Sequence, residues 1–402
     1  MYDVVIVGAR CAGSALALLL ARAGHKVLMV DRTVFPSDTM SGHYIHQAGV
    51  SCLRRWGVLE RLQATNTPAQ HTMTIDFGPV VLTGQPTPAA DGTKFGYAPR
   101  RWLFDPLLAA AAVEAGAEFW DGVSVAGPIF EDGRVNGIRG MTRASRSVEV
   151  RAHLIVGADG RRSGIAAAVG AEKYHRRPAT TCNYYSYWSG FEISHPHLFV
   201  RDGQFAVAVP TNNGLTIINM AWPITAFHSV RADLERSFYA ALARIPWLAD
   251  RIPTAARAER FMGTADLEGY FRTAYGPGWA LVGDAGYHRD PITAQGMTDA
   301  FLHAELLTHA ISEGLNGRRP LDATLADYQR LRDNATMPMF DLTCDMALLA
   351  PPSPEMKTLI DALQSDTVAT QRFMGVIAGT VRLDDFFAPA NIERIVGARR
   401  AA

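Results

Sequence analysis

The chain has 402 residues, enough for two average domains or one large, elaborated one. Hydrophobic residues make up 48% of the chain and charged residues 19%, a balance typical of a globular protein with a sizeable core. The 39 basic and 39 acidic side chains cancel to a formal net charge of zero, so charge gives no reason to expect nucleic acid as a partner.

The four cysteines lie far apart, at positions 11, 52, 182 and 344, with no C-x-x-C spacing. This distribution disfavours a metal cluster or a disulfide framework and favours a reducing compartment. No apolar run reaches the roughly 18 residues that a membrane span needs. The first strand also runs at once into a glycine turn, unlike a signal peptide. We therefore expect a cytoplasmic protein without a metal site or a membrane span.

The first thirty-two residues carry the clearest pattern. Residues 4–7 form a short apolar run, typical of a strand buried on both faces. G-A-R-C-A-G at residues 8–13 opens a helix, and residues 27–30 form a second strand that ends at Asp31. This layout fits the dinucleotide fingerprint, in which a helix N-terminus faces the pyrophosphate and an acid binds a ribose hydroxyl. Arg10 replaces the usual second glycine, so its guanidinium must point away or lie along the phosphates.

The next segments alternate between helical and strand patterns. A loop with Gly42 and His43 precedes an amphipathic helix, and short alternating runs between residues 71 and 92 predict strands. The stretch R-R-W-L-F-D leads into a predicted helix over residues 106–115. Strands are expected after it as far as residue 151, with Asp132-Gly133 as a hairpin turn.

Two further stretches repeat the pattern of an apolar strand followed by small residues and an acid. The first is L-I-V-G-A-D-G-R-R-S at residues 154–163, and the second is W-A-L-V-G-D-A-G-Y-H-R-D-P at residues 279–291. Between them, residues 173–275 are rich in aromatic side chains that alternate as in half-buried antiparallel strands. The chain beyond residue 325 is predicted to be largely helical.

The three motifs occur in an order that resembles the fingerprint of FAD-dependent oxidoreductases with the para-hydroxybenzoate hydroxylase fold. The G-x-R-x-x-G turn and the G-D-A-G-Y-H-R-D-P stretch look closer to the geranylgeranyl-reductase-like and halogenase-like branch. Three strand ends of one parallel sheet would converge on one crevice, where such sheets bind ligands.

The expected fold is therefore α/β: a Rossmann-like FAD-binding domain, an inserted, mainly antiparallel β substrate domain and a helical C-terminal segment. The FAD-binding domain is predicted to be discontinuous, over residues 1–70, 97–172 and 276–345. The substrate domain is expected over residues 71–96 and 173–275, and the C-terminal helices over residues 346–402.

The resemblance implies FAD as the cofactor and assigns roles to several positions. Asp31 should bind the adenosine ribose, Arg101 the ribityl–phosphate portion, and Asp284 the ribityl or pyrophosphate region. The N–H groups of Gly296 and Met297 at a helix N-terminus would stabilise negative charge at flavin N1–C2=O. The implied cofactor-binding residues are Gly8, Arg10, Cys11, Ala12, Gly13, Asp31, Arg32, Arg101, Asp159, Gly160, Gly283, Asp284, Pro291, Gly296 and Met297.

Simpler roles stay open for several of these positions. Asp284 is also compatible with a helix N-cap, Asp159-Gly160 with a structural turn, and Arg101 with a surface ion pair. His43, His46 and His288 lie near the motifs, but a lone loop histidine is more often structural than catalytic. His43 and His288 are therefore weak candidates, and the catalytic residues stay unassigned. The residues proposed for a substrate pocket are Tyr185, Tyr187 and Phe205.

The activity that the resemblance implies is that of a single-component monooxygenase. NAD(P)H would reduce FAD, O2 would add at C4a, and the hydroperoxide would hydroxylate an aromatic or other electron-rich small molecule. Thr298 and Asp299 follow the final glycine, shortly after which the hydroxylases usually place asparagine. A flavin-dependent reductase or dehydrogenase of carbon–carbon double bonds is therefore the main alternative.

Two further alternatives are less favoured. The W-x-W-x-I-P motif of halogenases is absent from the sequence. The other is a non-catalytic flavin-binding protein, which would not be an enzyme. The sequence leaves open the substrate, the oligomeric state, and the choice between NADH, NADPH and a separate flavin reductase.

Overall fold

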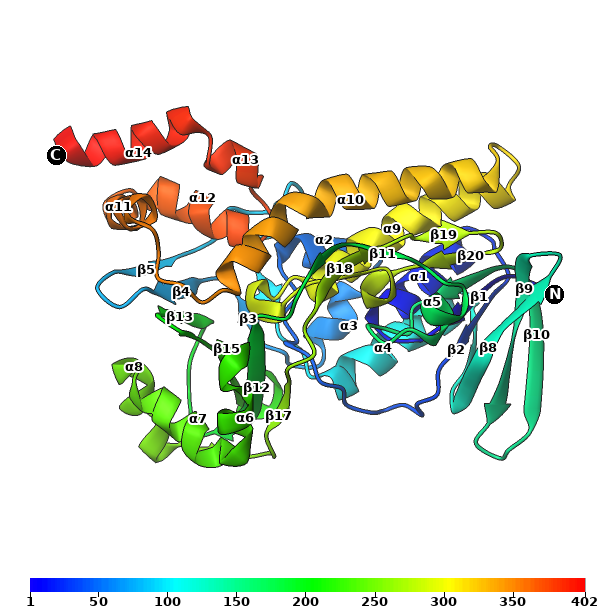
Figure 1. Ribbon diagram of the computed structural model, residues 1–402, viewed down its shortest axis with the longest axis horizontal. Coiled ribbons are helices and arrows are strands. Elements are labelled where there is room, and N and C mark those ends of the chain that lie inside the picture. The colour runs from blue at the N-terminus through cyan, green and yellow to red at the C-terminus, as the bar shows by residue number, and fades with distance from the viewer. Residues whose placement is uncertain (402) are drawn as a thin grey trace.

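A parallel sheet organises the first domain of the computed structural model, which describes residues 1–401, and lies toward the right in Figure 1. Its strands follow the order β20 (Trp279–Leu281), β10 (Ser147–Gly157), β1 (Tyr2–Val7), β2 (Val27–Val30) and β7 (Glu118–Trp120), with β19 (Tyr275–Gly276) antiparallel at one edge. Residues 148–151 and 154–157, predicted as separate strands, belong to the single strand β10 because its pairing continues from β9 to β1.

Both faces of this sheet are covered, which explains its continuous apolar runs. Val4 and Ile6 face a core that contains α1 (Cys11–Arg22), α4 (Arg101–Glu114) and α9 (Gly296–Leu315). Val5 and Val7 face the opposite core, built with the hairpin of β8 (Val123–Glu131) and β9 (Arg134–Thr142) and with α5 (Gly164–Ala168). Alternate side chains of β1 therefore pack into two separate cores.

Helix α4 begins five residues before the predicted start at Pro106. The N-cap Arg100 is extended, and the first turn is closed by an ion pair between Arg101 and Asp105, four residues apart. Pro106 therefore lies inside the helix rather than at its first position. The segment before it contains α2 (Gln47–Arg55), α3 (Leu59–Gln63), β3 (Ala69–Gln70) and β6 (Gly96–Tyr97).

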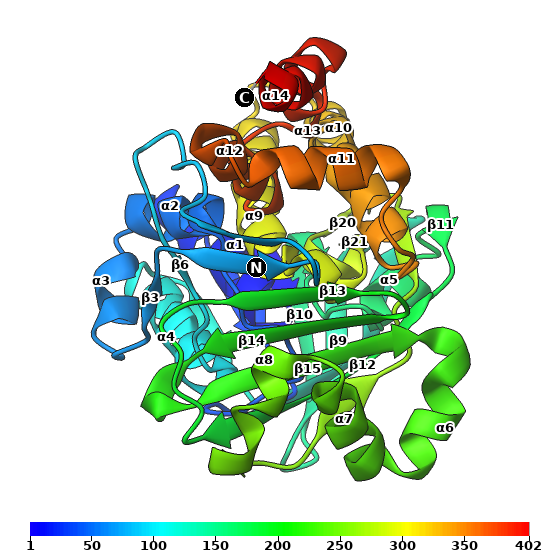
Figure 2. The same ribbon diagram turned by 90° about the vertical axis from the view of Figure 1, so that its left-hand side faces the viewer.

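A second, mainly antiparallel sheet lies beside the first domain (Figure 2). Its order is β16 (Ala256–Arg257), β12 (Thr181–Ser189), β15 (Thr216–Pro223), β14 (Gln204–Pro210), β13 (His197–Arg201), β4 (Met73–Asp76) and β5 (Val81–Gly84), and β17 (Met262–Thr264) also pairs with β12. One face is packed against α6 (Phe227–Ala232), α7 (Leu234–Ala243) and α8 (Pro246–Ala249). Strands β4 and β5 come from residues 71–96 and join this sheet through β13.

Helices make up most of the C-terminal region and pack beside β4 and β5. They are α10 (Leu321–Met346), α11 (Pro354–Leu363), α12 (Thr367–Ile377), α13 (Leu383–Phe386) and α14 (Pro389–Ala401). A small sheet of β11 (Lys173–Arg177), β18 (Gly269–Arg272) and β21 (Tyr287–His288) connects the two larger units. The expected α/β class with a second sheet and a helical C-terminal region is confirmed, while the exact domain boundaries stay a prediction.

Candidate functional site

The three loops singled out in the sequence meet at one edge of the parallel sheet. Val7 lies opposite both Val30 and Gly157 in the strand register, and Gly157 lies opposite Leu281. The carboxyl ends of β1, β2, β10 and β20 therefore coincide, which is where open α/β sheets bind ligands.

Close packing of the glycine turns holds these loops together. Gly8 has a φ of +104°, and a Cβ there would lie 2.4 Å from the Ala158 carbonyl oxygen of the middle loop. Gly283 has a φ of +61°, and a Cβ there would lie 2.7 Å from the Cβ of Ala12. At each position a side chain would be disfavoured by the positive φ and would clash with the neighbouring loop. Glycine is therefore required at positions 8 and 283.

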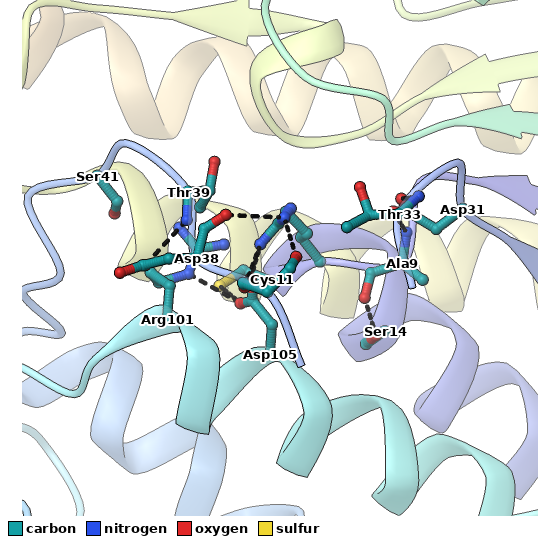
Figure 3. Close-up of polar contacts among 12 residues, drawn as sticks. Ala9, Cys11, Ser14, Asp31, Thr33, Asp38, Thr39, Ser41, Arg101 and Asp105 are labelled. Carbon is teal, nitrogen blue, oxygen red and sulfur yellow. Dashed lines mark hydrogen bonds and ion pairs between the residues drawn. The ribbon is translucent and has the colours of Figure 1, made fainter. Parts of the chain in front are cut away.

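A buried carboxylate, Asp105 of α4, binds the side chains around the first turn (Figure 3). Its oxygens accept hydrogen bonds from Arg10 Nη1 at 2.5 Å and Arg101 Nε at 2.8 Å, and Cys11 Sγ lies at 3.6 Å. Burial works to lower the pKa of Arg101, but Asp105 and Cys11 raise it above its usual value. Burial also raises the pKa of the Cys11 thiol to about 12, so this thiol stays protonated.

The Arg10 side chain takes part in this network. Its guanidinium points toward α4 and also donates to Ser37 Oγ at 2.9 Å. A phosphate contact through its remaining N–H groups stays a prediction. Arg101 is buried rather than at the surface, so the alternative of a surface ion pair is wrong.

Asp31 braces the glycine turn at the end of β2. Its carboxylate accepts hydrogen bonds from Ala9 N at 2.9 Å and Thr33 N at 2.8 Å. Each carboxylate oxygen retains a second lone pair, so a ribose hydroxyl can still donate to Asp31. Arg32, the next residue, is exposed to solvent.

In the middle loop, Asp159 stabilises the start of α5. Its carboxylate accepts hydrogen bonds from Ser163 Oγ at 2.5 Å and Gly164 N at 2.7 Å, at the start of α5. Gly160 adopts a φ of +79°, as the turn requires. A contact between this acid–glycine pair and the cofactor stays a prediction.

The third loop presents both exposed and buried groups. Asp284 is exposed in a short turn whose N-cap is Val282, so the alternative role of Asp284 as a cap is wrong. Pro291 and Gly296 are also exposed, whereas Met297 is buried. A Cβ on Gly296 would meet no heavy atom within 4 Å, so open space lies before the first N–H groups of the 20-residue helix α9.

These features fit FAD. The cramped first turn leaves its backbone N–H groups at the N-terminus of α1, as a pyrophosphate requires. The open N-terminus of α9 suits a ring that becomes negatively charged on reduction.

A buried ion pair behind this loop was missed by sequence reasoning. Arg289 Nη2 lies 2.6 Å from Asp299 Oδ2, and both side chains are almost entirely buried. Burial raises the pKa of Asp299, and the nearby Arg289 opposes that rise. Arg289 Nε and Nη1 are buried without a hydrogen-bond partner among residues 1–401. An acid in the first turn of α9, ten residues after an arginine, was the only signal for this pair.

All three predicted pocket residues lie on one face of the second sheet. Tyr185 and Tyr187 are two residues apart on β12 and so share a face. Tyr185 pairs with Asn219, and Phe205 pairs with Ala221, which lies on the same face as Asn219. The alternate residues of β12, such as Tyr184, point into the core beneath α6 to α8.

The loop after β2 contacts this face. Tyr185 Oη accepts a hydrogen bond from Ser41 N at 3.2 Å, and His43 Nε2 is hydrogen-bonded to Tyr187 Oη. Burial, with Arg101 and Arg100 nearby, lowers the pKa of His43 well below its usual value, and burial raises the pKa of Tyr187. Both rings are therefore neutral at physiological pH and are joined by one hydrogen bond. Ile292 of the third loop joins the apolar cluster around Phe205.

Two other histidines have defined contacts. His46 Nε2 is hydrogen-bonded to the Thr293 carbonyl oxygen at 3.1 Å, so it carries the proton. His288 Nδ1 lies 2.7 Å from the Glu268 carbonyl oxygen in the small sheet. These main-chain contacts are structural, and a catalytic role for His288 stays a prediction.

The centre of the same sheet face holds a residue that sequence reasoning overlooked. Asn219 and its cross-strand partner Val207 retain intermediate exposure, whereas their neighbours on the face are buried. The signal was present, because Asn219 interrupts the apolar run L-T-I-I-N-M-A-W. The part of the chain that the structure describes contains no cluster of three metal-ligating residues and no helix suited to crossing a membrane.

Comparison with known proteins gives matches over most of the chain. A family model described as "FAD binding domain" matches residues 1–343. A menaquinone reductase of Mycolicibacterium smegmatis is 30% identical over 323 residues, covering 76% of this chain and 76% of that protein. A digeranylgeranylglycerophospholipid reductase of Methanothrix thermoacetophila is 24% identical over 405 residues, covering 95% of this chain and 96% of that protein.

Solved structures match nearly the whole fold. The myxobacterial chondrochloren halogenase CndH has a TM-score of 0.81 at 21% identity, covering 99% of this chain and 96% of that one. A geranylgeranyl bacteriochlorophyll reductase-like protein from Thermoplasma acidophilum has a TM-score of 0.76 at 19% identity, covering 99% and 98%. At these identities the likeness shows the fold alone.

Proposed function

Because the chain belongs to the FAD-binding-domain family, whose model matches residues 1–343, we propose that this FAD-dependent oxidoreductase is a monooxygenase. Its substrate would be an aromatic or other electron-rich small molecule, and NAD(P)H and O2 would be the co-substrates. Sequence relatives named digeranylgeranylglycerophospholipid reductases support the branch predicted from the three motifs.

One observation supports this activity: the substrate-side face of the second sheet is buried and carries aromatic and hydroxyl groups. Tyr185 and Tyr187 lie on it with Phe205, and the loops that contain Ser41 and Ile292 close over it. A flavin oxygenation needs such a water-excluding enclosure, because water competes with the organic substrate.

The residues of the three loops would hold FAD, which supplies electron transfer from the nicotinamide and reaction with O2 when bound. Gly8 and Gly13 would form the turn under the pyrophosphate, and Asp31 would accept a hydrogen bond from the ribose hydroxyl. Arg101 would bind the ribityl–phosphate portion, and Asp284 the ribityl or pyrophosphate region. The N–H groups of Gly296 and Met297 would stabilise the negative charge of the reduced ring.

His43 is the best-placed side chain for a hydrogen bond to a substrate hydroxyl group. It is neutral, buried and hydrogen-bonded to Tyr187, whose ring lies 3.8 Å from the Arg100 guanidinium carbon. Arg100 opposes the rise in the pKa of Tyr187 that burial causes, and the neutral His43–Tyr187 pair can orient a hydroxyl substrate through hydrogen bonds. Tyr187→Phe should lower kcat while leaving FAD content unchanged.

The sequence relatives favour a second candidate, reduction of carbon–carbon double bonds. The relative with 30% identity is named a menaquinone reductase, and several others are named digeranylgeranylglycerophospholipid reductases. Such an enzyme would use the same FAD site and would donate reducing equivalents to an alkene rather than to O2.

The two activities separate in one experiment on the FAD-loaded protein. Reduction by NADH and by NADPH is followed first without oxygen, and then with ¹⁸O2 and a panel of phenols, and with menaquinone. Label entering a phenol supports the monooxygenase, whereas a double bond lost from menaquinone without label supports the reductase. A requirement for an added flavin reductase would identify the missing electron donor. Protein that stays colourless after incubation with FAD overturns both.

A further inference from the structure

A chain of hydrogen bonds connects the centre of the substrate-side sheet to the loop before α9. Asn219 Nδ2 donates to Asn183 Oδ1 at 3.2 Å, and Asn183 Nδ2 donates to Thr181 Oγ1 at 2.9 Å. Thr181 Oγ1 in turn donates to Asp290 Oδ2 at 2.5 Å. Asp290 Oδ1 accepts the N–H of Ile292, so the chain ends inside the third loop.

The chain has a fixed direction, and this direction determines what Asn219 can offer. An ionised carboxylate only accepts hydrogen bonds, so the Thr181 hydroxyl donates to Asp290 and can only accept from Asn183. The carbonyl oxygen of Asn183 is then left to accept from Asn219 Nδ2. The Asn219 carbonyl oxygen remains without a donor among residues 1–401.

The position of Asn219 gives this oxygen access to a ligand. On this face, residues paired across β12, β15 and β14 form three rows. Asn219 lies in the middle row, between Tyr185 and Val207. In these rows only Asn219 and Val207 retain intermediate exposure, and Phe205 and its neighbours are buried. The middle of the face is therefore an accessible patch with one hydrogen-bond acceptor beside an apolar side chain.

We propose that Asn219 is the specificity-determining residue of the substrate site, and that its carbonyl oxygen accepts a hydrogen bond from a hydroxyl or N–H group of the substrate. The apolar body of the substrate would lie on Val207. This inference deepens the proposed function and rests on it. It favours phenol-like molecules over hydrocarbons of the same shape, because a hydrocarbon would cover this acceptor without giving it a hydrogen bond, which is costly.

The same chain makes Asn219 a link to the flavin loop. Asp290 directly precedes Pro291, one of the residues expected beside the flavin ring. Thr181→Val removes the hydroxyl that joins Asn183 to Asp290 while keeping the shape of the side chain. This variant should weaken p-cresol binding less than a change of Asn219 itself, because the Asn219 carbonyl oxygen remains in place.

Equilibrium dialysis of the oxidised, FAD-loaded protein tests the proposal without NADPH. The probes are p-cresol and p-xylene, which differ by a hydroxyl in place of a methyl group. Wild-type protein should bind p-cresol about 2- to 10-fold more tightly than p-xylene, the range of one neutral hydrogen bond. Asn219→Leu should remove this preference, and Met220→Leu, on the opposite face of β15, should keep it.

The outcomes are distinct from those of the oxygenation assay. A preference for p-cresol that survives in Asn219→Leu, equal binding of both probes to wild-type protein, or no binding of p-cresol overturns the inference. If Asn219→Leu fails to retain FAD, Asn219→Val replaces it, because valine favours strands. A protein that prefers p-cresol but never oxygenates a phenol would keep this inference and refute the monooxygenase.

Discussion

The Asp105 network permits a quantitative prediction. Asp105→Asn keeps the size of the side chain but removes the carboxylate charge that pairs with both Arg10 and Arg101. Asp105 is fully buried and Arg101 nearly so, whereas the Arg10 side chain is 24% exposed and can partly rehydrate. Removing one partner of a buried ion pair lowers the free energy of unfolding by about 3–5 kcal/mol. Because Arg10 is partly exposed, we expect the lower end of this range, about 3 kcal/mol.

That loss should appear in thermal unfolding. Unfolding entropies scale with chain length, so a loss of about 3 kcal/mol lowers the Tm of a chain this long by about 3–4 °C. The measurement is calorimetry of the FAD-free protein, with FAD titration as a second assay. Asp105→Asn should also weaken FAD binding, because Arg101 loses the carboxylate that orients it.

A matched control lies on the same helix. Glu114→Gln removes the same charge from α4, but Glu114 is exposed and pairs with the exposed Arg61. Surface ion pairs contribute little, so this variant should unfold at the wild-type temperature. If Asp105→Asn unfolded at that same temperature, the buried network would not stabilise the first turn as argued.

Three further results are expected. Asp284→Ala should weaken FAD binding about 10- to 100-fold, the worth of a charged hydrogen bond, and unchanged affinity in fluorescence titration would count against its assigned role. Gly8→Ala should abolish FAD retention, because its Cβ would clash with the carbonyl oxygen of Ala158; normal flavin content in the purified variant would contradict this. Burial lowers the pKa of His46 to about 4 and that of His303 to about 3, so the unfolded chain binds these protons first as the pH falls below about 6.5. Lowering the pH from 7.5 to 5.5 should cost about 1.4 kcal/mol per histidine, and His303→Gln should show a smaller fall in Tm over this range.

The sequence by itself determined the parts of the protein that depend on local spacing. Glycine at positions 8, 13 and 283, an acid at the end of β2 and apolar runs of strand length follow from backbone geometry and burial. These features were sufficient to predict the parallel sheet and the meeting of the three loops, whereas FAD as the cofactor was implied by the resemblance of the three motifs to a known family. The predicted α4 boundary was wrong because the Arg101–Asp105 ion pair extends the helix in front of a proline.

Only the tertiary structure decided which distant side chains contact each other. The contact of Arg10 with Asp105 requires α4 to pack against the first glycine turn, 95 residues away in the sequence. The exposure of Asn219 depends on strand register, since a shift of one residue would turn it into the opposite core. Periodicity gives the alternation of faces along a strand, but pairing with other strands decides which face meets the flavin loop.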